Sequence, residues 1–314
     1  MRAYVIDAFG EKGSVREVPD PAAAEGQVLV RIRAAGVNPF DHTLVEGHMK
    51  DRLEHRFPFV PGLDGSGVIE ARGEGVHEFA VGDAVFGAAG KPFFGEGTFA
   101  EMTAMSVGTI APKPDAIDFA QAASIPTPGV AALTVLDAAD VREGETLLAV
   151  GASGGVGSFL VQMAADRGLH VIGVARGENA EYVRGLGASD FIDYTAADTE
   201  EALRSIAPDG IDAIADMSGN KELVTRLSEQ LRPDGRVASS AGGADEESLG
   251  PRGVKASNIF ARVDAEQLGR LAQAIEEGRV RTPEVETLPL DRAADAIVRA
   301  GERHTRGKLV LEIG

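Results

Sequence analysis

The feature that most constrains the fold is a glycine-rich turn between an apolar strand and a helix. Strand Thr146–Val150 runs into Gly151-Ala152-Ser153-Gly154-Gly155-Val156-Gly157, and a helix is expected over 156–167. Glycine at such a turn lets a phosphate reach the free amides of the helix N-terminus. It also lets the helix pack closely on the strand. The pattern predicts a dinucleotide site whose pyrophosphate meets Ser153, Gly154, Gly155, Val156 and Gly157.

Strands and helices alternate after this turn, with strands expected over 170–175, 191–192, 211–216 and 236–240. Such alternation requires a parallel sheet with crossover helices. A helical stretch over 118–139, interrupted at 126–129, is expected to lead into it. Strand 170–175 ends in Ala175 and Arg176, where an NAD-binding unit usually carries a carboxylate. A guanidinium there pairs with a 2′-phosphate, so NADPH is preferred, although Arg176 could also face only solvent.

The first ~120 residues read as β-rich, as in a small, partly open barrel or sandwich. Val28, Val30, Ile32 and Ala34 alternate with polar positions along one strand. The final segment predicts helices over 265–277 and 292–300 and a strand over 308–313.

Charge and composition exclude several classes of protein. The chain of 314 residues has a net charge of −18, which repels nucleic acid. No apolar run approaches the ~18 residues of a membrane span, and no secretory leader is visible, so a cytoplasmic location is expected. Cysteine is absent, which excludes disulfides and thiolate metal sites.

Several motifs together resemble the medium-chain dehydrogenase/reductase superfamily over essentially the whole chain. The resemblance is carried by residues 34–41, 61–67, 81–85, 151–157 and 306–310. It implies an α/β fold: a GroES-like β-rich domain plus a Rossmann domain with a doubly wound parallel sheet. The domains are expected at 1–120 with 263–314 for the GroES-like catalytic domain, and at 121–262 for the NADP(H)-binding domain.

The sequence departs from the zinc-dependent members of this superfamily. Asn38 stands where they have a cysteine ligand, and Leu63 stands where they have a histidine ligand. The chain therefore resembles the zinc-independent quinone oxidoreductase branch, which includes zeta-crystallin. Without a Lewis acid, hydride addition to a quinone or enone is easier to support than simple carbonyl reduction, because the enolate spreads its charge. The expected substrate is a small apolar carbonyl or quinone, and no metal is expected.

The resemblance implies that Asn38 faces the nicotinamide and the substrate carbonyl, with capping of the turn before Pro39 as its structural alternative. Asp41 is the second candidate catalytic residue, with a purely structural role in orienting the loop as its alternative. Thr43 stands where some relatives have a tyrosine. We expect solvent to protonate the enolate, with Thr43 or His42 as weak helpers.

The remaining cofactor candidates follow from the resemblance and from the rule that ligands bind at the carboxyl ends of parallel strands. Thr127, Tyr194 and Lys308 each have a structural alternative: re-entry of the helix, a half-buried tyrosine at a strand end, and a surface lysine. The set comprises Thr127, Tyr194, Ser218, Ser240, Ala241, Ile259, Phe260 and Lys308.

Two functions remain open from sequence. One is an NADPH-dependent reductase of quinones or α,β-unsaturated carbonyls, in a homodimer as is common in relatives. The other is an NADPH-binding protein with little catalysis, as some crystallins of this family suggest. A domain of a larger enoyl-reducing synthase is disfavoured, since strands are expected at both ends of the chain.

Overall fold

The computed structural model describes residues 1–314, which form two compact units. Unit 1 comprises Met1–Thr127, Val263–Gly278 and Thr282–Gly314, and unit 2 comprises Pro128–Arg262 and Arg279–Arg281. The expected boundary at 120 therefore differs from the structure by seven residues. The reason is local, because helix α2 (Phe119–Ala123) packs against strands of unit 1.

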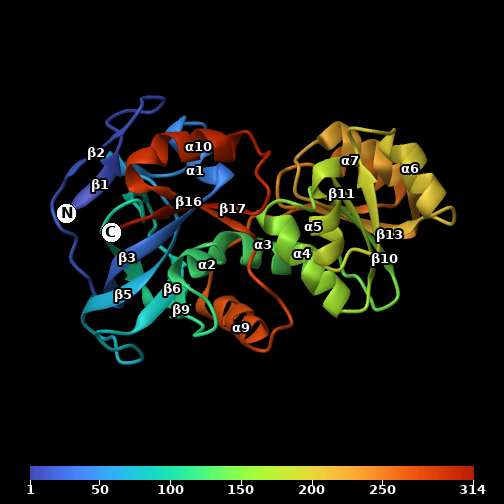
Figure 1. The fold of residues 1–314 in the computed structure, drawn as a ribbon. Coiled ribbons are helices and arrows are strands. Elements are labelled where there is room, and N and C mark those ends of the chain that lie inside the picture. Colours follow the sequence, from blue (N-terminus) through green and yellow to red (C-terminus); the bar gives the residue numbers. More distant parts are fainter. The chain divides into compact units, whose positions relative to one another are not determined.

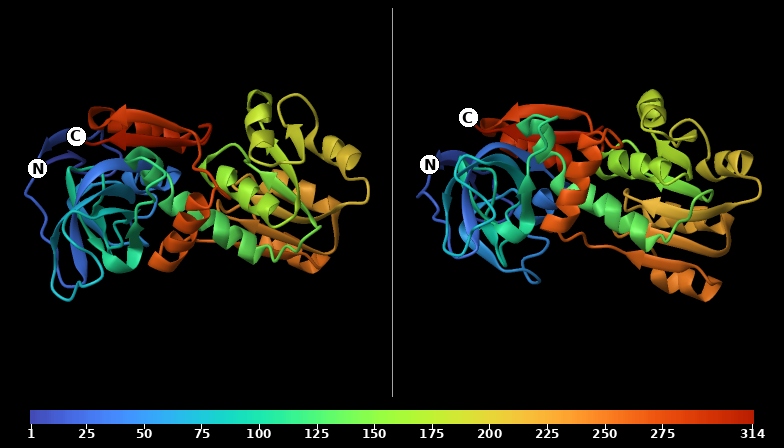
Figure 2. Two further views of the ribbon diagram at one scale, coloured as in Figure 1. Left: turned by 60° about the horizontal axis from the view of Figure 1, so that its bottom comes forward. Right: turned by 90° about the horizontal axis from the view of Figure 1, so that it is seen from below.

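Unit 1 is built on a seven-stranded sheet of order β16-β17-β3-β5-β6-β9, with β8 also paired to β3. The C-terminal strand β17 pairs antiparallel with β3, so red and blue segments lie side by side in Figures 1 and 2. The strands are β3 (Gln27–Val37), β5 (Asp64–Arg72), β6 (Ala84–Ala88), β8 (Met102–Ser106), β9 (Ile110–Pro112), β16 (Val285–Pro289) and β17 (Lys308–Glu312).

The alternation predicted along β3 is confirmed. Val28, Val30, Ile32 and Ala34 are each at most 1% exposed, while Arg33 points to solvent. These buried side chains join residues of helix α10 (Ala293–Gly301) and strand β17 in the core of unit 1. The C-terminal segment thus completes this core by hydrophobic burial.

The smaller elements of unit 1 surround this sheet. Two two-stranded sheets pair β1 with β2 and β4 with β7. The elements are β1 (Arg2–Val5), β2 (Ser14–Glu17), β4 (His55–Val60), β7 (Phe94–Glu96), α1 (Pro39–Val45), α9 (Ala265–Glu276) and α10 (Ala293–Gly301).

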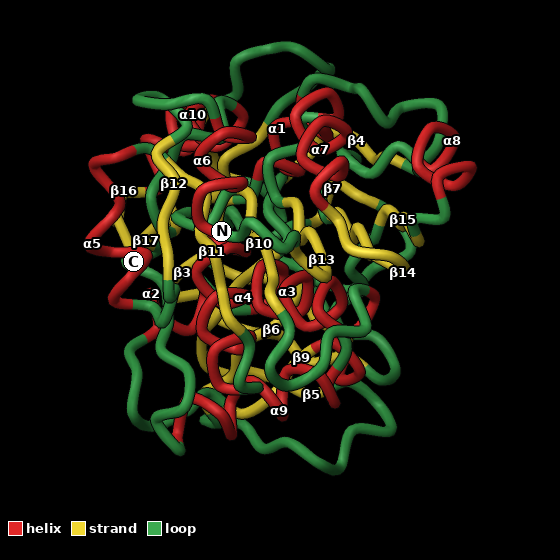
Figure 3. The backbone as a smooth tube through the Cα atoms, turned by 90° about the vertical axis from the view of Figure 1, so that its right-hand side faces the viewer, coloured by secondary structure: helices red, strands yellow, loops and turns green.

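Unit 2 is a six-stranded parallel sheet of order β12-β11-β10-β13-β14-β15. Figure 3 shows these strands from β12 on the left to β14 and β15 on the right. The chain runs outward from β10 to β12 and then returns to β13, so the strand order reverses between β10 and β13. The strands are β10 (Thr146–Val150), β11 (His170–Ala175), β12 (Asp190–Asp193), β13 (Ile211–Asp216), β14 (Leu231–Ser239) and β15 (Lys255–Asn258).

The helices of unit 2 connect the parallel strands. Helices α4 and α5 pack on β10, β11 and β12, and α8 packs on β15. Their bounds are α4 (Gly155–Asp166), α5 (Ala180–Gly185), α6 (Thr199–Ile206), α7 (Lys221–Leu227) and α8 (Glu246–Leu249). Helix α3 (Pro126–Ala138) precedes β10, and its first two residues belong to unit 1.

The prediction of a helix broken at 126–129 is wrong. The break lies at Ser124 and Ile125, and Pro126 begins α3. Proline suits a first helical position, because its missing N–H would have no helical acceptor there and its φ is already helical. Strand β15 escaped prediction because Lys255-Ala-Ser-Asn258 is a short, polar edge strand without an apolar run. No helix of the chain has both the length and the apolar character needed to span a membrane.

Candidate active site and dinucleotide site

The glycine turn of unit 2 has the geometry of a pyrophosphate cradle. Gly151 adopts a φ of +87°, which favours glycine, and Gly154 is the extended N-cap residue of α4. A Cβ on Gly157 would lie 2.3 Å from the Gly151 carbonyl oxygen, so only glycine fits there. A Cβ on Gly154 would meet no protein atom closer than 3.7 Å. Gly154 therefore leaves space that the fold itself does not need.

The backbone amides at this turn are available to a ligand. Gly155, Val156 and Gly157 form the first turn of α4, where N–H groups have no helical acceptor. Ser153 lies just before the N-cap and is half-buried. A negatively charged pyrophosphate fits these free amides and the positive end of the helix dipole. The residues present thus fit the dinucleotide that the fold implies.

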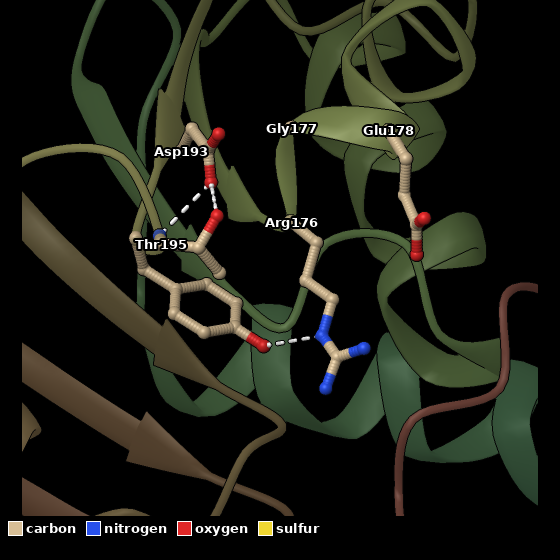
Figure 4. A pocket seen from close by; sticks show the side chains of 6 residues that line it. Arg176, Gly177, Glu178, Asp193 and Thr195 are labelled. Carbon is tan, nitrogen blue, oxygen red and sulfur yellow. Dashed lines mark hydrogen bonds between the residues drawn. The ribbon is translucent and has the colours of Figure 1, made fainter.

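A second feature of unit 2 is a pocket of about 360 Å³ at the ends of β11 and β12 (Figure 4). Arg176 follows β11, and its Nε donates to the Tyr194 hydroxyl over 3.1 Å. Asp193, at the end of β12, accepts hydrogen bonds from the amide and hydroxyl of Thr195. Glu178 also lines the pocket. Arg176 and Tyr194, both expected to contact the adenosine end of the cofactor, are brought together here.

Buried Asp216 organises the carboxyl ends of β13 and β14. Its carboxylate accepts from the Ser218 amide (2.9 Å), the Ser218 hydroxyl (2.6 Å) and the Ser239 hydroxyl (2.6 Å). Ser239 in turn accepts from the amides of Ala241 (3.1 Å) and Gly243 (2.9 Å). These two loops lie beside the point where the strand order reverses, the usual ligand position in such sheets.

The structure also places the other residues predicted in unit 2. The Ser240 amide donates to the Asp216 carbonyl, and the Ile259 amide donates to the Ser239 carbonyl. Phe260 is 73% exposed and lies two residues after the end of the edge strand β15. Sequence reasoning missed Asp216 and Ser239. Asp216 could have been noticed as a carboxylate at the end of an apolar strand. A carboxylate buried there is costly unless several hydrogen-bond donors surround it.

The central site of unit 1 is a buried polar cluster around Asn38. Asn38 is 3% exposed and occupies the N-cap position of α1, but its side chain makes no capping hydrogen bond. Its Nδ2 donates to Asp64 Oδ2 over 3.0 Å, and its Oδ1 accepts from Lys308 Nζ over 2.5 Å. Lys308 Nζ also donates to the Val37 carbonyl over 2.7 Å. The predicted Asn38 and Lys308, 270 residues apart in sequence, therefore form one network.

Asp64 joins this network to the start of α3. Thr127 Oγ1 donates to Asp64 Oδ1 over 2.6 Å, and the Thr127 amide lies 3.2 Å from both carboxylate oxygens. The Thr127 amide is one of the free donors of the first turn of α3, so the carboxylate satisfies it. Asp64 was missed as a site residue. The sequence feature that could have identified Asp64 is its position as the acidic residue of the 61–67 motif, next to Leu63.

Burial shifts the pKa of every ionisable group in the cluster. It raises the pKa of Asp41 to about 7, although the hydrogen bond from the Asn38 backbone N–H and the charge of Lys308 oppose the change. Burial likewise raises the pKa of Asp64, opposed chiefly by Lys308, and lowers the pKa of Lys308, opposed by Asp64. One cation thus faces two carboxyl groups. The charge of Lys308 opposes the effect of burial on the pKa of both carboxyl groups, and the two carboxylates oppose it on the pKa of Lys308.

Asp41 and Thr43 hold helix α1 in place. Asp41 Oδ2 accepts a hydrogen bond from the backbone N–H of Asn38 over 2.7 Å, which supports the alternative that Asp41 orients the loop. Thr43 Oγ1 donates to the Pro39 carbonyl over 3.2 Å, within the helix. His42 packs against Gly301 of α10, where an added Cβ would come within 2.6 Å of its ring. These contacts leave Asn38 as the member of the predicted catalytic set with the most polar partners.

The side chains present do not fit a zinc ion. No group of three or more His, Cys, Asp or Glu side chains comes together in a metal-binding arrangement. The chain has no cysteine, and Asn38 bonds to Lys308 and Asp64 rather than pointing at a set of metal ligands. The cluster around Asn38 is thus a hydrogen-bond network rather than a coordination site.

Comparison with known proteins agrees with this architecture. The family profile described as "Alcohol dehydrogenase GroES-like domain" matches residues 24–115, and "Zinc-binding dehydrogenase" matches residues 186–311. A quinone oxidoreductase of Rattus norvegicus is 32% identical, over 94% of this chain and 92% of the relative. The chain belongs to the medium-chain dehydrogenase/reductase superfamily, in its quinone oxidoreductase branch.

Other members of the superfamily cover the whole chain. An NADPH-dependent alkenal/one oxidoreductase of Arabidopsis thaliana is 31% identical, over 99% of this chain and 79% of the relative. The solved structure of a quinone oxidoreductase from Coxiella burnetii has a TM-score of 0.90 and 29% identity, and it covers 100% of this chain and 99% of its own. The expected pairing of a GroES-like domain with a Rossmann domain is confirmed.

Proposed function

We propose that this chain is a zinc-independent, NADPH-dependent reductase that transfers hydride to a quinone or an α,β-unsaturated carbonyl. The observation that carries the proposal is the buried Asn38 amide, a hydrogen-bond donor held between Lys308 and Asp64. Relatives named as quinone and alkenal/one oxidoreductases support the substrate class. When bound, the nicotinamide cofactor supplies the hydride for the β-carbon of the acceptor.

The residues of the chain bind the cofactor, orient the acceptor and stabilise the charge that develops on its oxygen. The free amides at Gly155, Val156 and Gly157 hold the pyrophosphate, and the loops fixed by Asp216 shape the ligand-binding end of the parallel sheet. The Asn38 amide donates to the oxygen of the acceptor as negative charge develops there. A donor aimed at a developing oxyanion typically contributes about 10²–10³ in kcat.

The direct test is NADPH oxidation with a panel of quinones and enones. We expect turnover of members of the panel and a loss of about 10²–10³ in kcat for Asn38→Ala. Asp198→Ala is the control for truncation of an N-cap residue, since Asp198 is the N-cap of another short helix, α6, and lies outside the Asn38 cluster. Tight NADPH binding without turnover on any substrate would instead favour the binding-protein alternative.

The preference for NADPH over NADH rests on Arg176. Its guanidinium lines the pocket beside Tyr194, whereas Glu178 and Asp193 on the same pocket oppose an added phosphate. We expect Arg176→Gln to weaken NADPH binding by about tenfold and to leave NADH binding unchanged, since the site is exposed and a charge-assisted bond is screened there. Glu178→Gln should tighten NADPH binding. Tighter binding of NADH than of NADPH by the unmodified protein would contradict the cofactor assignment.

The proposal also includes a homodimer and a cytoplasmic location. Strand β15 ends the parallel sheet of unit 2, so one side of this strand is free of a partner within its own sheet. A net charge of −18 disfavours nucleic acid as a partner. Sedimentation of the purified protein tests whether it forms a dimer. A mass corresponding to one chain at micromolar concentration would contradict the dimer. Relatives include mitochondrial and chloroplastic proteins, so fractionation of the native cells tests the location.

A further inference from the structure

The Asn38 amide has only one stable orientation in its network. Lys308 Nζ carries only donors, so it must face the amide oxygen (2.5 Å). An ionised Asp64 carries only acceptors, so it must face the amide nitrogen (3.0 Å). Turning the amide by 180° would oppose donor to donor on one side and acceptor to acceptor on the other. The side-chain amide of Asn38 thus bridges Lys308 and Asp64.

The same network leaves one donor of Asn38 without a protein partner. The backbone N–H of Asn38 donates to Asp41 Oδ2, and its carbonyl accepts from the Asp41 amide. Nδ2 carries two hydrogens, and its one bond to the protein goes to Asp64. The second N–H therefore makes no hydrogen bond to the protein.

We propose that Lys308 and Asp64 are positioning residues that fix and polarise the Asn38 amide, so that its second N–H donates to the oxyanion formed during reduction. This inference rests on the proposed function and deepens it. Neither Lys308 nor Asp64 touches the substrate, because each acts through the amide. Asn38 is the group in contact with the reacting molecule.

Polarisation follows from the charge at each end of the amide. The ammonium group on Oδ1 draws electron density from the amide nitrogen, which makes its remaining N–H a stronger donor. Hydrogen bonds in such a chain strengthen one another in a medium of low dielectric constant. The cluster provides that medium, because Lys308 is 5% exposed, Asn38 3% and Asp64 0%.

The expected effect depends on how much charge the transition state places on oxygen. Quinones are stronger hydride acceptors than simple enones, so their transition state is reached earlier with less charge on oxygen. We expect Lys308→Met to lower kcat by about 10²–10³ with an enone and by about tenfold with a quinone, at unchanged NADPH affinity. A purely structural defect would lower both rates by the same factor.

Asp64→Asn is the second variant and preserves the shape of the cluster. Thr127 donates its hydroxyl to Oδ1, so the oxygen of the new amide would take that place. Its NH₂ group would then face Asn38 Nδ2, donor against donor. We expect the same loss, larger with the enone than with the quinone. Lys113→Met is the matched control, since Lys113 Nζ also bonds two acceptors, the carbonyls of Pro114 and Ile117.

A binding measurement decides the inference without turnover. The probe is 4-nitrophenol, bound in the presence of NADP⁺, because its ionised oxygen mimics the oxyanion and its ionisation changes its absorbance. We expect the unmodified protein and Lys113→Met to bind the phenolate form preferentially, and Lys308→Met and Asp64→Asn to lose that preference. No phenolate preference in the unmodified protein, or the same preference in all four, would overturn the inference. Absence of turnover on the whole panel would overturn the proposed function instead, and phenolate binding would still distinguish the four proteins.

Discussion

Replacement of Asp216 by asparagine should destabilise unit 2 strongly, although the two side chains have nearly the same shape. Asp216 is 0% exposed, and its carboxylate accepts from the Ser218 hydroxyl and amide and from the Ser239 hydroxyl. An asparagine has one oxygen. If that oxygen serves Ser218, the new NH₂ group faces Ser239, whose oxygen already accepts from two amides. The Ser239 hydroxyl hydrogen then loses its acceptor in the interior.

The magnitude follows from these contacts. One hydrogen bond to a charged group is lost, worth about 1.5–3 kcal/mol, and a buried donor is left without an acceptor at about 1–3 kcal/mol. The free energy of unfolding should therefore fall by about 2.5–6 kcal/mol, which lowers the midpoint of thermal unfolding by roughly 5–25 °C for a unit of this size. The assay is urea and thermal unfolding followed by circular dichroism.

Asp193→Asn is the matched control for this prediction. Asp193 also ends a parallel strand and accepts from the amide and hydroxyl of the residue two positions later, Thr195. It is partly exposed, and water can replace the lost partners, so its substitution should have a far smaller effect. The reasoning would be refuted if Asp216→Asn cost less than about 1 kcal/mol, or no more than Asp193→Asn.

Two further predictions follow from the glycine turn and from Asp41. Gly157→Ala should lower the midpoint of thermal unfolding, because its Cβ would lie 2.3 Å from the Gly151 carbonyl oxygen. Gly154→Ala should instead weaken dinucleotide binding at least about tenfold and leave the midpoint unchanged. Similar midpoints for the two variants would contradict this prediction. Burial raises the pKa of Asp41 from 3.8 to about 7, so its protonation stabilises the fold below about pH 4 and this contribution is lost as pH rises to about 7. Asp41→Asn should flatten the pH dependence of the free energy of unfolding within this window, and a slope equal to that of the unmodified protein would rule out Asp41 as its source.

The sequence alone determined the features that depend on local backbone requirements and periodic burial. Glycines at 151–157 sit where a strand must turn into a helix beside a phosphate, and few other folds use that pattern. The alternation along β3 and the bounds of β10, β11 and β13 followed from hydrophobic periodicity. Arg176 and Tyr194 meet because the carboxyl ends of adjacent parallel strands share one edge of a sheet.

Only the tertiary structure decided the network around Asn38 and the loops around Asp216. Lys308 and Asn38 are 270 residues apart in sequence, and they meet because β17 pairs antiparallel with β3. Asp64 and Thr127 meet because the first turn of α3 needs an acceptor that no local pattern specifies. A buried polar group is stable only when distant donors and acceptors satisfy it together, and that condition belongs to the packed chain rather than to any segment of it.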